Sequence, residues 1–291
     1  MKPEGRKDAS RSEKRKSRPQ HVAQVLSTRR ISDHLVSLTL GGPGLAAFEA
    51  KDATDQYIKL LFADPALGLT PPYDLDAIRE QHGPGGVPVR RTYTVRSVRA
   101  GADAAGIEID VEFVTHGDEG LAGPWAAAAQ PGDVIAFSGP GGNFAPTPGS
   151  WQLLLGDESA LPAIACALEA MGPQERGVVL LDVEGPGDEL ELSAPAGVSV
   201  RWLHRGAAWT PSSTQLDAAV RAVQIPEGEP VQVFAHGERE TMKALRKHLV
   251  EERGLDRRQL SLSAYWAYGR AEDAFQAEKR TPIGKIFPED A

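Results

Sequence analysis

The chain has 291 residues, of which 41% are hydrophobic and 25% are charged, so it holds enough apolar material for a core and is not disordered throughout. Its single cysteine, Cys166, excludes an internal disulfide and a cysteine-rich zinc site. No apolar run approaches the ~20 residues that cross a bilayer, and the polar N-terminus lacks the apolar segment of a secretory signal, so a cytoplasmic protein without membrane insertion is expected.

The net charge of −8 is unevenly distributed along the chain. Residues 1–18 contain eight basic and three acidic side chains, which makes this segment +5 and the remainder −13. Because the segment has almost no apolar side chains, residues 1–20 are predicted to form a disordered basic tail. The tail has no aromatic residues between its basic ones and the rest of the chain is acidic, so no nucleic-acid partner is expected.

The first half of the chain has the pattern of an antiparallel β-barrel. Short runs rich in β-forming residues are separated by turn signals, and residues 107–113 alternate between apolar and polar, as in a half-buried strand. The six runs are residues 22–26, 35–40, 57–62, 91–96, 107–113 and 133–137. Residues 122–130 look helical, and residues 67–89, which contain several prolines and glycines, are predicted to be a long inserted loop. Six short strands of this kind indicate a small closed barrel.

From residue 151 the pattern changes to apolar strands that alternate with helices. Strands are predicted at residues 151–155, 177–183, 198–203, 231–235 and 260–266, and helices at residues 160–171, 214–223 and 238–252. This alternation is typical of a parallel sheet, whose ligands bind beyond the carboxyl ends of its strands. The loop after the first strand, residues 156–160, lacks the G-x-G-x-x-G fingerprint of dinucleotide binding, and Cys166 in the following helix is expected in the core. The predicted fold class is therefore a β-barrel plus an α/β domain.

Arg91, Tyr93 and Thr94, within the fourth predicted strand, form one candidate site. An arginine can pair with phosphate, a tyrosine can cover an aromatic ring, and a threonine can offer hydrogen bonds. This combination suits a flavin nucleotide. The alternative is an edge strand with ordinary polar residues.

A second candidate site runs from His116 to Gly120 and into the helical stretch. Amides at the start of a helix bind pyrophosphate well, and Pro124 fits a first helical turn. His116, Asp118 and Glu119 do not have a recognisable spacing of metal ligands, so no metal is expected.

These segments, taken in order, resemble the siderophore-interacting proteins, which are FAD-dependent ferric-siderophore reductases of the ferredoxin-reductase superfamily. The resemblance runs from residue 21 to residue 275. It is carried by residues 57–62 (YIKLLF), 91–96 (RTYTVR), 116–126 (HGDEGLAGPWA), 131–133 (PGD), 156–164 (GDESALPAI), 202–205 (WLHR) and 264–270 (AYWAYGR). It implies an FAD-binding barrel over residues 21–147, an NAD(P)H-binding-like α/β domain over residues 148–270 and a C-terminal extension over residues 271–291.

The resemblance also implies roles for single residues. Arg91 would contact the FAD phosphates, Tyr93 would lie against the cofactor, and Thr94 would lie near the flavin ring. Lys59 matches a basic residue of the siderophore pocket, where a cation suits an anionic ferric siderophore; an outward-facing strand lysine is the alternative. The other implied cofactor-binding residues are His116, Gly117, Gly120, Leu121, Ala122, Gly123 and Trp125 in the diphosphate segment, and Asp157, Glu158, Ser159, Ala160, Arg205 and Trp266 in the second domain.

Two departures from the family pattern bear on the site. The family's Gly-Pro-Ala-Ser reads Gly120-Leu-Ala-Gly123 here, which removes a hydroxyl but leaves the amides, so FAD binding is still expected. The family's Gly-Tyr-Trp-Arg reads Ala264-Tyr-Trp-Ala267, so one basic side chain expected near the substrate is missing. The residues considered as its replacement are Arg270, Lys279, Arg280 and Lys285.

The function implied by the resemblance is a two-stage relay. Hydride passes from a nicotinamide to the flavin, and electrons then pass singly to Fe(III) in a ferric siderophore, which holds Fe(II) far less tightly. No side chain is expected to act as an acid or a base. The donor stays open, because Arg205 favours NADPH, Glu184 favours NADH, family habit leans to NADPH, and some members look better served by ferredoxin. Two other functions also stay open: a flavin or ferric reductase of broad range, and a non-catalytic siderophore-binding protein.

Overall fold

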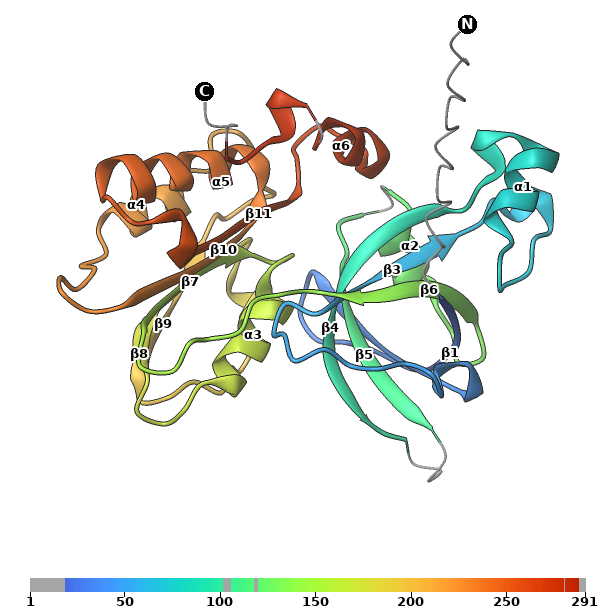
Figure 1. The fold of residues 1–291 in the computed structure, drawn as a ribbon, viewed down its shortest axis with the longest axis horizontal. Coiled ribbons are helices and arrows are strands. Elements are labelled where there is room, and N and C mark those ends of the chain that lie inside the picture. The colour runs from blue at the N-terminus through green and yellow to red at the C-terminus, as the bar shows by residue number, and fades with distance from the viewer. Residues whose placement is uncertain (1–18, 102–105, 118–119, 280, 288–291) are drawn as a thin grey trace, which may run out of the picture.

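The computed structural model describes residues 19–101, 106–117, 120–279 and 281–287, which form a barrel followed by a sheet (Figure 1). Most of the predicted tail, residues 1–18, lies outside the described residues. Gln20 begins the first strand, and its side-chain amide donates a hydrogen bond to the carbonyl of Tyr73 at 2.7 Å. Gln20 therefore belongs to the barrel and not to the predicted tail.

The first six strands close an antiparallel barrel in the order β1-β2-β5-β4-β3-β6. Their bounds are β1 Gln20–Arg30, β2 Leu35–Gly41, β3 Tyr57–Phe62, β4 Val89–Ala100, β5 Ile107–Val114 and β6 Val134–Gly141. The alternation in residues 107–113 turns Ile109, Val111 and Phe113 into the barrel, where all three are fully buried. Helix α2 (Ala122–Ala128) follows β5 and adds Ala122 and Ala126 to the same core. All six predicted strands and the predicted helix are confirmed.

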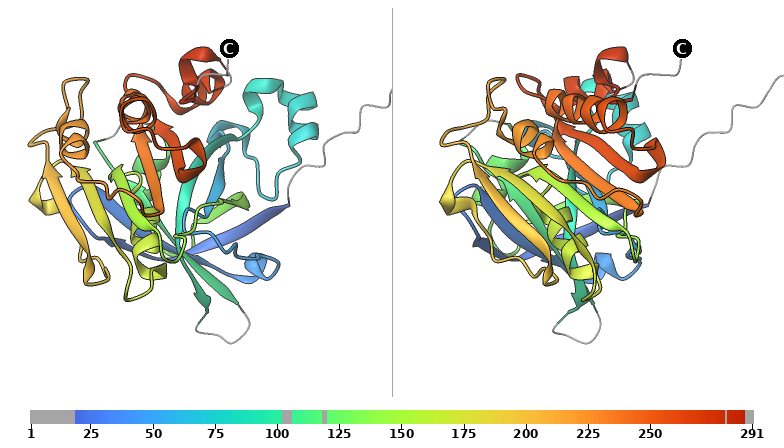
Figure 2. Two further views of the ribbon diagram at one scale, coloured as in Figure 1. Left: turned by 60° about the vertical axis from the view of Figure 1, so that its left-hand side comes forward. Right: turned by 90° about the vertical axis from the view of Figure 1, so that its left-hand side faces the viewer.

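One prediction for the barrel is wrong. Residues 67–89, expected to be a loop, contain helix α1 (Leu75–His82), which projects beside the barrel (Figure 2). Asp74 caps this helix, because its carboxylate accepts a hydrogen bond from the Ala77 amide at 3.0 Å. Ile78 is its one buried residue, so the segment has no apolar period that would reveal a helix.

The second half forms a five-stranded parallel sheet in the order β11-β10-β7-β8-β9. Its strands are β7 Trp151–Asp157, β8 Arg176–Val183, β9 Gly197–His204, β10 Val231–Glu238 and β11 Leu260–Trp266. Its helices are α3 Leu161–Ala170, α4 Gln215–Arg221 and α5 Arg239–Arg246, and a π-helical segment, Lys247–Glu252, continues α5. The central strand β7 is buried along its whole length, with α4 and α5 on one face of the sheet and α3 on the other (Figure 1). The predicted parallel sheet is confirmed.

Helix α3 joins the two halves of the molecule. Its apolar face belongs to one cluster with Leu35 of β2 and Phe144 of the connecting segment. The Sγ atom of Cys166 on α3 lies 3.1 Å from the carbonyl oxygen of Arg96 on β4, and the Arg96 guanidinium pairs with Glu169 of α3. Cys166, expected in the core, therefore lies partly buried at the joint between barrel and sheet.

The C-terminal extension returns to the barrel. Helix α6 (Glu272–Glu278) buries Phe275 in the cluster below α4 and α5 and also contacts β4. Figure 1 shows it above the place where the sheet meets the barrel. No helix within the described ranges is long and apolar enough to cross a bilayer.

Candidate functional site

Strand β4 presents its candidate residues on two faces. Arg91 and Tyr93 share one face, and the ring of Tyr93 packs on Phe113 of the barrel core with centroids 4.3 Å apart. Burial raises the pKa of Tyr93, so its phenol is neutral. Thr94 lies on the other face and is 6% exposed. The strand therefore places Tyr93 against the barrel core and Thr94 on the face that meets the second domain.

The Arg91 guanidinium is paired with a carboxylate of the C-terminal extension. Its Nη1 and Nη2 atoms donate to Oδ1 and Oδ2 of Asp273 at 3.0 and 3.3 Å. The Arg91 side chain is 15% exposed, whereas that of Asp273 is 62% exposed. Because water can solvate Asp273 when the pair separates, this contact holds Arg91 weakly.

Thr94 meets the second domain through Tyr265 of β11. The side chains of Thr94 and Tyr265 are hydrogen-bonded, and the Tyr265 ring packs edge-on against His236 with centroids 4.8 Å apart. Burial raises the pKa of Tyr265, so its hydroxyl stays protonated. The residue predicted to lie near the flavin ring thus sits at the seam between barrel and sheet.

The segment after β5 has an open backbone and an unpaired hydroxyl. Gly117 and Gly120 have positive φ angles of 59° and 83°, and in the described part of the chain no atom beyond their sequence neighbours lies within 4 Å of where a Cβ would stand. His116 is exposed beside them. Thr115, at the base of the segment, is 8% exposed, and its hydroxyl has no hydrogen-bond partner among the described residues. A buried hydroxyl without a partner is costly, so this position fits a ligand atom such as a phosphate oxygen.

Helix α2 follows this segment in the chain and packs on β5. Leu121 precedes it and is 39% exposed, while Ala122 is buried. Gly123 lies so close to β5 that a Cβ would stand 3.0 Å from the carbonyl oxygen of Val114. Trp125 packs edge-on against aromatic rings of the barrel core. The glycine backbone, the Thr115 hydroxyl and the β4 motif together fit an FAD molecule on the barrel.

Asp157, at the carboxyl end of β7, connects the candidate residues of the second domain. It is 5% exposed and accepts hydrogen bonds from the Ser159 amide at 3.0 Å and from the Ser159 hydroxyl. It also accepts from the Glu238 amide at 3.1 Å and from the Trp266 indole at 2.8 Å. Asp157 thereby ties the ends of three strands together and holds Ser159 partly exposed before Ala160, at the start of α3.

Arg205 is enclosed by acidic side chains. Its side chain is 5% exposed, and Nη2 donates to Oε1 of Glu158 at 2.5 Å while Nη1 donates to the Asp182 carbonyl at 2.8 Å. Burial raises the pKa of the Asp182 carboxyl, although the charge of Arg205 opposes this shift. Glu158 also accepts from the Glu184 amide at 2.9 Å. The cluster links the carboxyl ends of β7, β8 and β9.

The basic residues considered for the substrate separate in space. Burial lowers the pKa of Lys279, the Glu272 carboxylate raises it, and the positive charge of Lys59 lowers it, so the two ammonium groups lie within electrostatic range of each other. Each lies over an aromatic ring, at 5.9 Å for Lys59 and 4.5 Å for Lys279. Arg270 is 44% exposed and donates to a glutamate of α6 at 2.8 Å. Lys285 is half-buried, and Arg280 lies outside the described residues.

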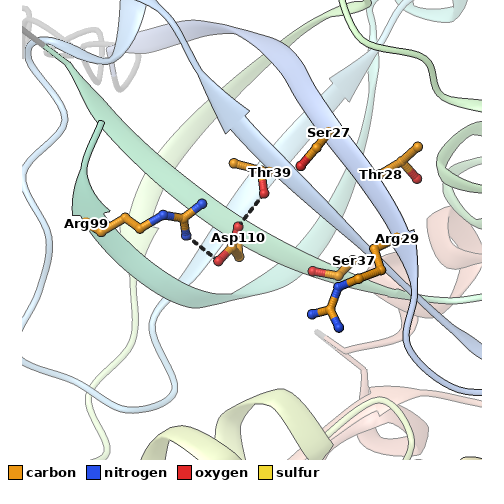
Figure 3. A pocket seen from close by; sticks show the side chains of 7 residues that line it. All are labelled: Ser27, Thr28, Arg29, Ser37, Thr39, Arg99 and Asp110. Atoms are coloured by element: carbon orange, nitrogen blue, oxygen red, sulfur yellow. Dashed lines mark hydrogen bonds and ion pairs between the residues drawn. The ribbon is translucent and has the colours of Figure 1, made fainter. Parts of the chain in front are cut away.

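A polar groove of about 410 Å³ on the outer face of the barrel is separate from these residues. Figure 3 shows Thr39 and Arg99 both bonded to Asp110 within it. Burial raises the pKa of Asp110, but hydrogen bonds from Arg99, Ser97 and Thr39 outweigh burial and lower it. None of the predicted site residues lines the groove, and its carboxylate is already satisfied.

No group of three histidine, cysteine or acidic side chains in the described ranges is arranged to hold a metal ion, and Asp118 and Glu119 lie outside those ranges. Sequence analysis did not single out Thr115, Tyr265 or Asp273. Tyr265 adjoins Trp266 inside a segment that carries the family resemblance, which was an available signal. Asp273 is 182 residues from its partner in the chain, so no local pattern could reveal that pair.

Family profiles match both halves of the chain. The siderophore-interacting FAD-binding domain matches residues 24–144, and the siderophore-interacting protein profile matches residues 149–269. An uncharacterised Mycobacterium tuberculosis protein is 44% identical over 275 residues, covering 90% of this chain and 95% of its own. The ferric vibriobactin reductase of Vibrio cholerae is 34% identical over 263 residues (88% of this chain, 93% of its own), and the NADPH-dependent ferric-chelate reductase of Escherichia coli is 30% identical over 249 residues (83% and 91%).

Solved structures agree. A siderophore utilisation protein from T. fusca superimposes with a TM-score of 0.74 at 34% identity, covering 87% of this chain and 94% of its own. The ferredoxin reductase of carbazole 1,9a-dioxygenase, at 17% identity and a TM-score of 0.60 over 85% of this chain and 70% of its own, shares the fold. This chain belongs to the siderophore-interacting protein family, with that family's FAD-binding domain as its barrel.

Proposed function

We propose that this chain is an FAD-dependent reductase that passes electrons from a nicotinamide nucleotide to Fe(III) in a ferric siderophore, in the cytoplasm. In balance, one NAD(P)H and two Fe(III) give NAD(P)⁺, two Fe(II) and one proton. Bound FAD supplies the conversion between a two-electron donor and a one-electron acceptor. We assign residues 21–147 to the FAD-binding domain, residues 148–270 to the donor-binding domain and residues 271–291 to an extension.

The observation that carries this proposal is the pair of ammonium groups beside the β4 motif. Lys59 stands on β3 directly opposite Thr92 of β4, and Lys279 follows α6, whose Asp273 is bonded to Arg91. Burial and the charge of Lys59 lower the pKa of Lys279, while the Glu272 carboxylate raises it, so an anion already favours the charged lysine here and a further anion would add to this effect. Ferric complexes of siderophores are often anionic, so these lysines would hold the substrate next to the barrel motif.

The remaining residues bind and position. Arg91 would exchange Asp273 for the diphosphate of FAD, since the two linked phosphates carry one negative charge each and offer more acceptor oxygens than one carboxylate. The Thr94 and Tyr265 hydroxyls would fix the distance between a ring on the barrel and a donor on the sheet. No side chain need move a proton on the iron complex. Relatives named ferric vibriobactin reductase and ferric-chelate reductase support the reaction class.

The test separates the acceptor reaction from the choice of donor. FAD-loaded protein is reduced anaerobically with dithionite, freed of excess reductant, and mixed with ferric siderophores or ferric citrate while Fe(II) is trapped by a chromogenic chelator. Rapid Fe(II) formation with siderophores and slow formation with citrate would support the proposal. Equal rates would favour a reductase of broad range, and tight siderophore binding without Fe(II) would favour a binding protein.

Lysine variants sharpen this test. Lys59→Gln and Lys279→Gln should each weaken siderophore binding by about tenfold, because each removes one charge-assisted contact. Lys247→Gln is the matched control, since Lys247 is exposed at the start of the π-helical segment that continues α5. Equal effects of all three substitutions would remove the two lysines from the substrate site. A ferredoxin donor would show as a protein that bleaches with reduced ferredoxin and with neither nucleotide.

A further inference from the structure

The carboxyl ends of β7, β8 and β9 meet at one edge of the sheet, where ligands of parallel sheets bind. In such sheets a carboxylate after the second strand accepts a hydrogen bond from the ribose 2′-hydroxyl of NADH, whereas a nearby arginine accommodates the 2′-phosphate of NADPH. The sequence offers both residue types at this edge, Glu184 and Arg205. Their surroundings in the fold decide between them.

Arg205 is not available for a 2′-phosphate. Two of its nitrogens are bonded to Glu158 and to the Asp182 main chain, and its side chain is 5% exposed. The Asp182 carboxylate stands 3.5 Å from it as well. Turning Arg205 toward solvent would leave two buried carboxylates without their cation, which is a large electrostatic cost. The positive charge of Arg205 therefore compensates the buried carboxylates of Glu158 and Asp182.

No other basic side chain described at this edge is available to bind a 2′-phosphate. Residues 184–197 and 206–214 contain no lysine or arginine, and residues 184–191 contain four acidic side chains. The His204 ring is bonded to Glu189 at 2.8 Å, and the His34 ring, which comes from the barrel, is bonded to Asp188 at 2.9 Å. The loops after β8 and β9 thus present negative charge to whatever approaches.

Glu184 has the opposite character. Its side chain is 34% exposed, its Oε2 atom lies 3.7 Å from Nε2 of His34, and its backbone amide donates to Glu158 at 2.9 Å. It stands at the end of β8, one residue beyond Val183. A fixed, accessible carboxylate accepts a hydrogen bond from a ribose hydroxyl and repels a phosphate that carries two negative charges.

We propose that this chain uses NADH in preference to NADPH, with Glu184 recognising the ribose 2′-hydroxyl and the Arg205 cluster withholding the cation that a 2′-phosphate needs. This inference rests on the proposed function and specifies its donor. It sets the chain apart from its Escherichia coli relative, which is named as NADPH-dependent.

The first measurement is the binding of NAD⁺ and NADP⁺ to FAD-loaded protein by isothermal titration calorimetry at physiological ionic strength. NAD⁺ should bind at least about tenfold more tightly, the equivalent of one hydrogen bond to a charged group. The rates of anaerobic flavin bleaching by NADH and NADPH should follow the same order. Tighter NADP⁺ binding, equal binding of the two nucleotides, or no binding of either would overturn the proposal.

Two substitutions test the role of Glu184. Glu184→Gln should reduce the preference for NAD⁺ by about fivefold or more, since it removes the charge and keeps the shape. Glu191→Gln removes the same charge from an exposed position in the same loop and should change the preference less than about twofold, because surface charges are screened. An equal change in both variants would mean that Glu184 makes no specific contact and would overturn the assignment.

The outcome is independent of the acceptor reaction. Dithionite-reduced protein that reduces a ferric siderophore while preferring NADPH would leave the proposed function standing and defeat this inference. Protein that prefers NAD⁺ but never yields Fe(II) would defeat the proposed function and leave the nucleotide preference in place.

Discussion

Arg91 and Arg205 look alike in the sequence, since each lies in or directly after a strand and each suits a phosphate. Their partners differ. Arg91 faces a carboxylate that is 62% exposed, whereas Arg205 is held by carboxylates of which the two side chains are 11% and 3% exposed. An exposed partner can be exchanged for a ligand, and buried partners cannot. We therefore expect the burial of the partner, more than the arginine itself, to decide whether an arginine can bind a ligand or has a structural role.

The largest effect is expected for Arg205→Met. Breaking a buried ion pair by removing one member typically costs about 3–5 kcal/mol, because the carboxylates that remain have lost their cation. Urea unfolding should show this loss. Arg201→Met, on an exposed position of β9 just before Arg205, should change the free energy of unfolding by less than about 0.5 kcal/mol. A stable Arg205→Met protein that had lost only NADP⁺ affinity would contradict the comparison.

Arg91→Ala should leave the fold intact and weaken FAD binding by about 10-fold to 100-fold, because a charge-assisted phosphate contact contributes about 1.5–3 kcal/mol. The flavin content of purified protein and a titration of the apoprotein with FAD measure this. Arg90→Ala is the control, since Arg90 points to the opposite face of β4 and is exposed. Unchanged flavin content in Arg91→Ala would remove Arg91 from the cofactor site.

The stabilisation from the contact between His34 of the barrel and Asp188 of the second domain should depend on pH. Burial lowers the pKa of His34, but its hydrogen bond to Asp188 and the charges of Asp188, Glu184 and Glu158 outweigh burial and raise it. The stabilisation is therefore complete below the unfolded pKa of about 6.5 and is lost as pH rises through the folded value. The difference in unfolding free energy between the wild type and His34→Gln should shrink from about pH 6 to about pH 9.

His204→Gln serves as the control for this prediction, because His204 and its partner Glu189 are both exposed at 37% and 41%. The difference in unfolding free energy between His204→Gln and the wild type should change less between about pH 6 and about pH 9 than the difference for His34→Gln. A pH dependence that survived in His34→Gln would assign the effect to another group.

The smallest effect is expected for Asp273→Asn. Surface ion pairs contribute about 0–1 kcal/mol, so stability should barely change. FAD should bind up to about fivefold more tightly, since Arg91 no longer exchanges partners. Glu227→Gln, which removes an exposed carboxylate elsewhere, should leave FAD affinity unchanged. Weaker FAD binding in Asp273→Asn would mean that Asp273 positions Arg91 for the phosphate instead of competing with it.

Sequence patterns sufficed for elements that bury one continuous face. The alternation in residues 107–113 and the apolar run of β7 specify their strands locally, so both could be predicted. Helix α1 depends on the Asp74 cap and a single buried residue, so its position could not be predicted from a sequence pattern. For the site, the residue types could be read from the sequence, and their roles remain predictions. The enclosure of Arg205 depends on Glu158, 47 residues away, and such spatial neighbours leave no trace in local spacing.

Because Cys166 contacts β4, the single thiol of the chain can report separation of the two domains. Burial raises the pKa of Cys166 to about 11, and its Sγ atom lies 3.1 Å from the Arg96 carbonyl across the joint. A thiol in this setting reacts slowly with alkylating reagents while the domains stay together. The alkylation rate of the native protein would therefore report how often barrel and sheet part, and whether a bound nucleotide or siderophore keeps them closed.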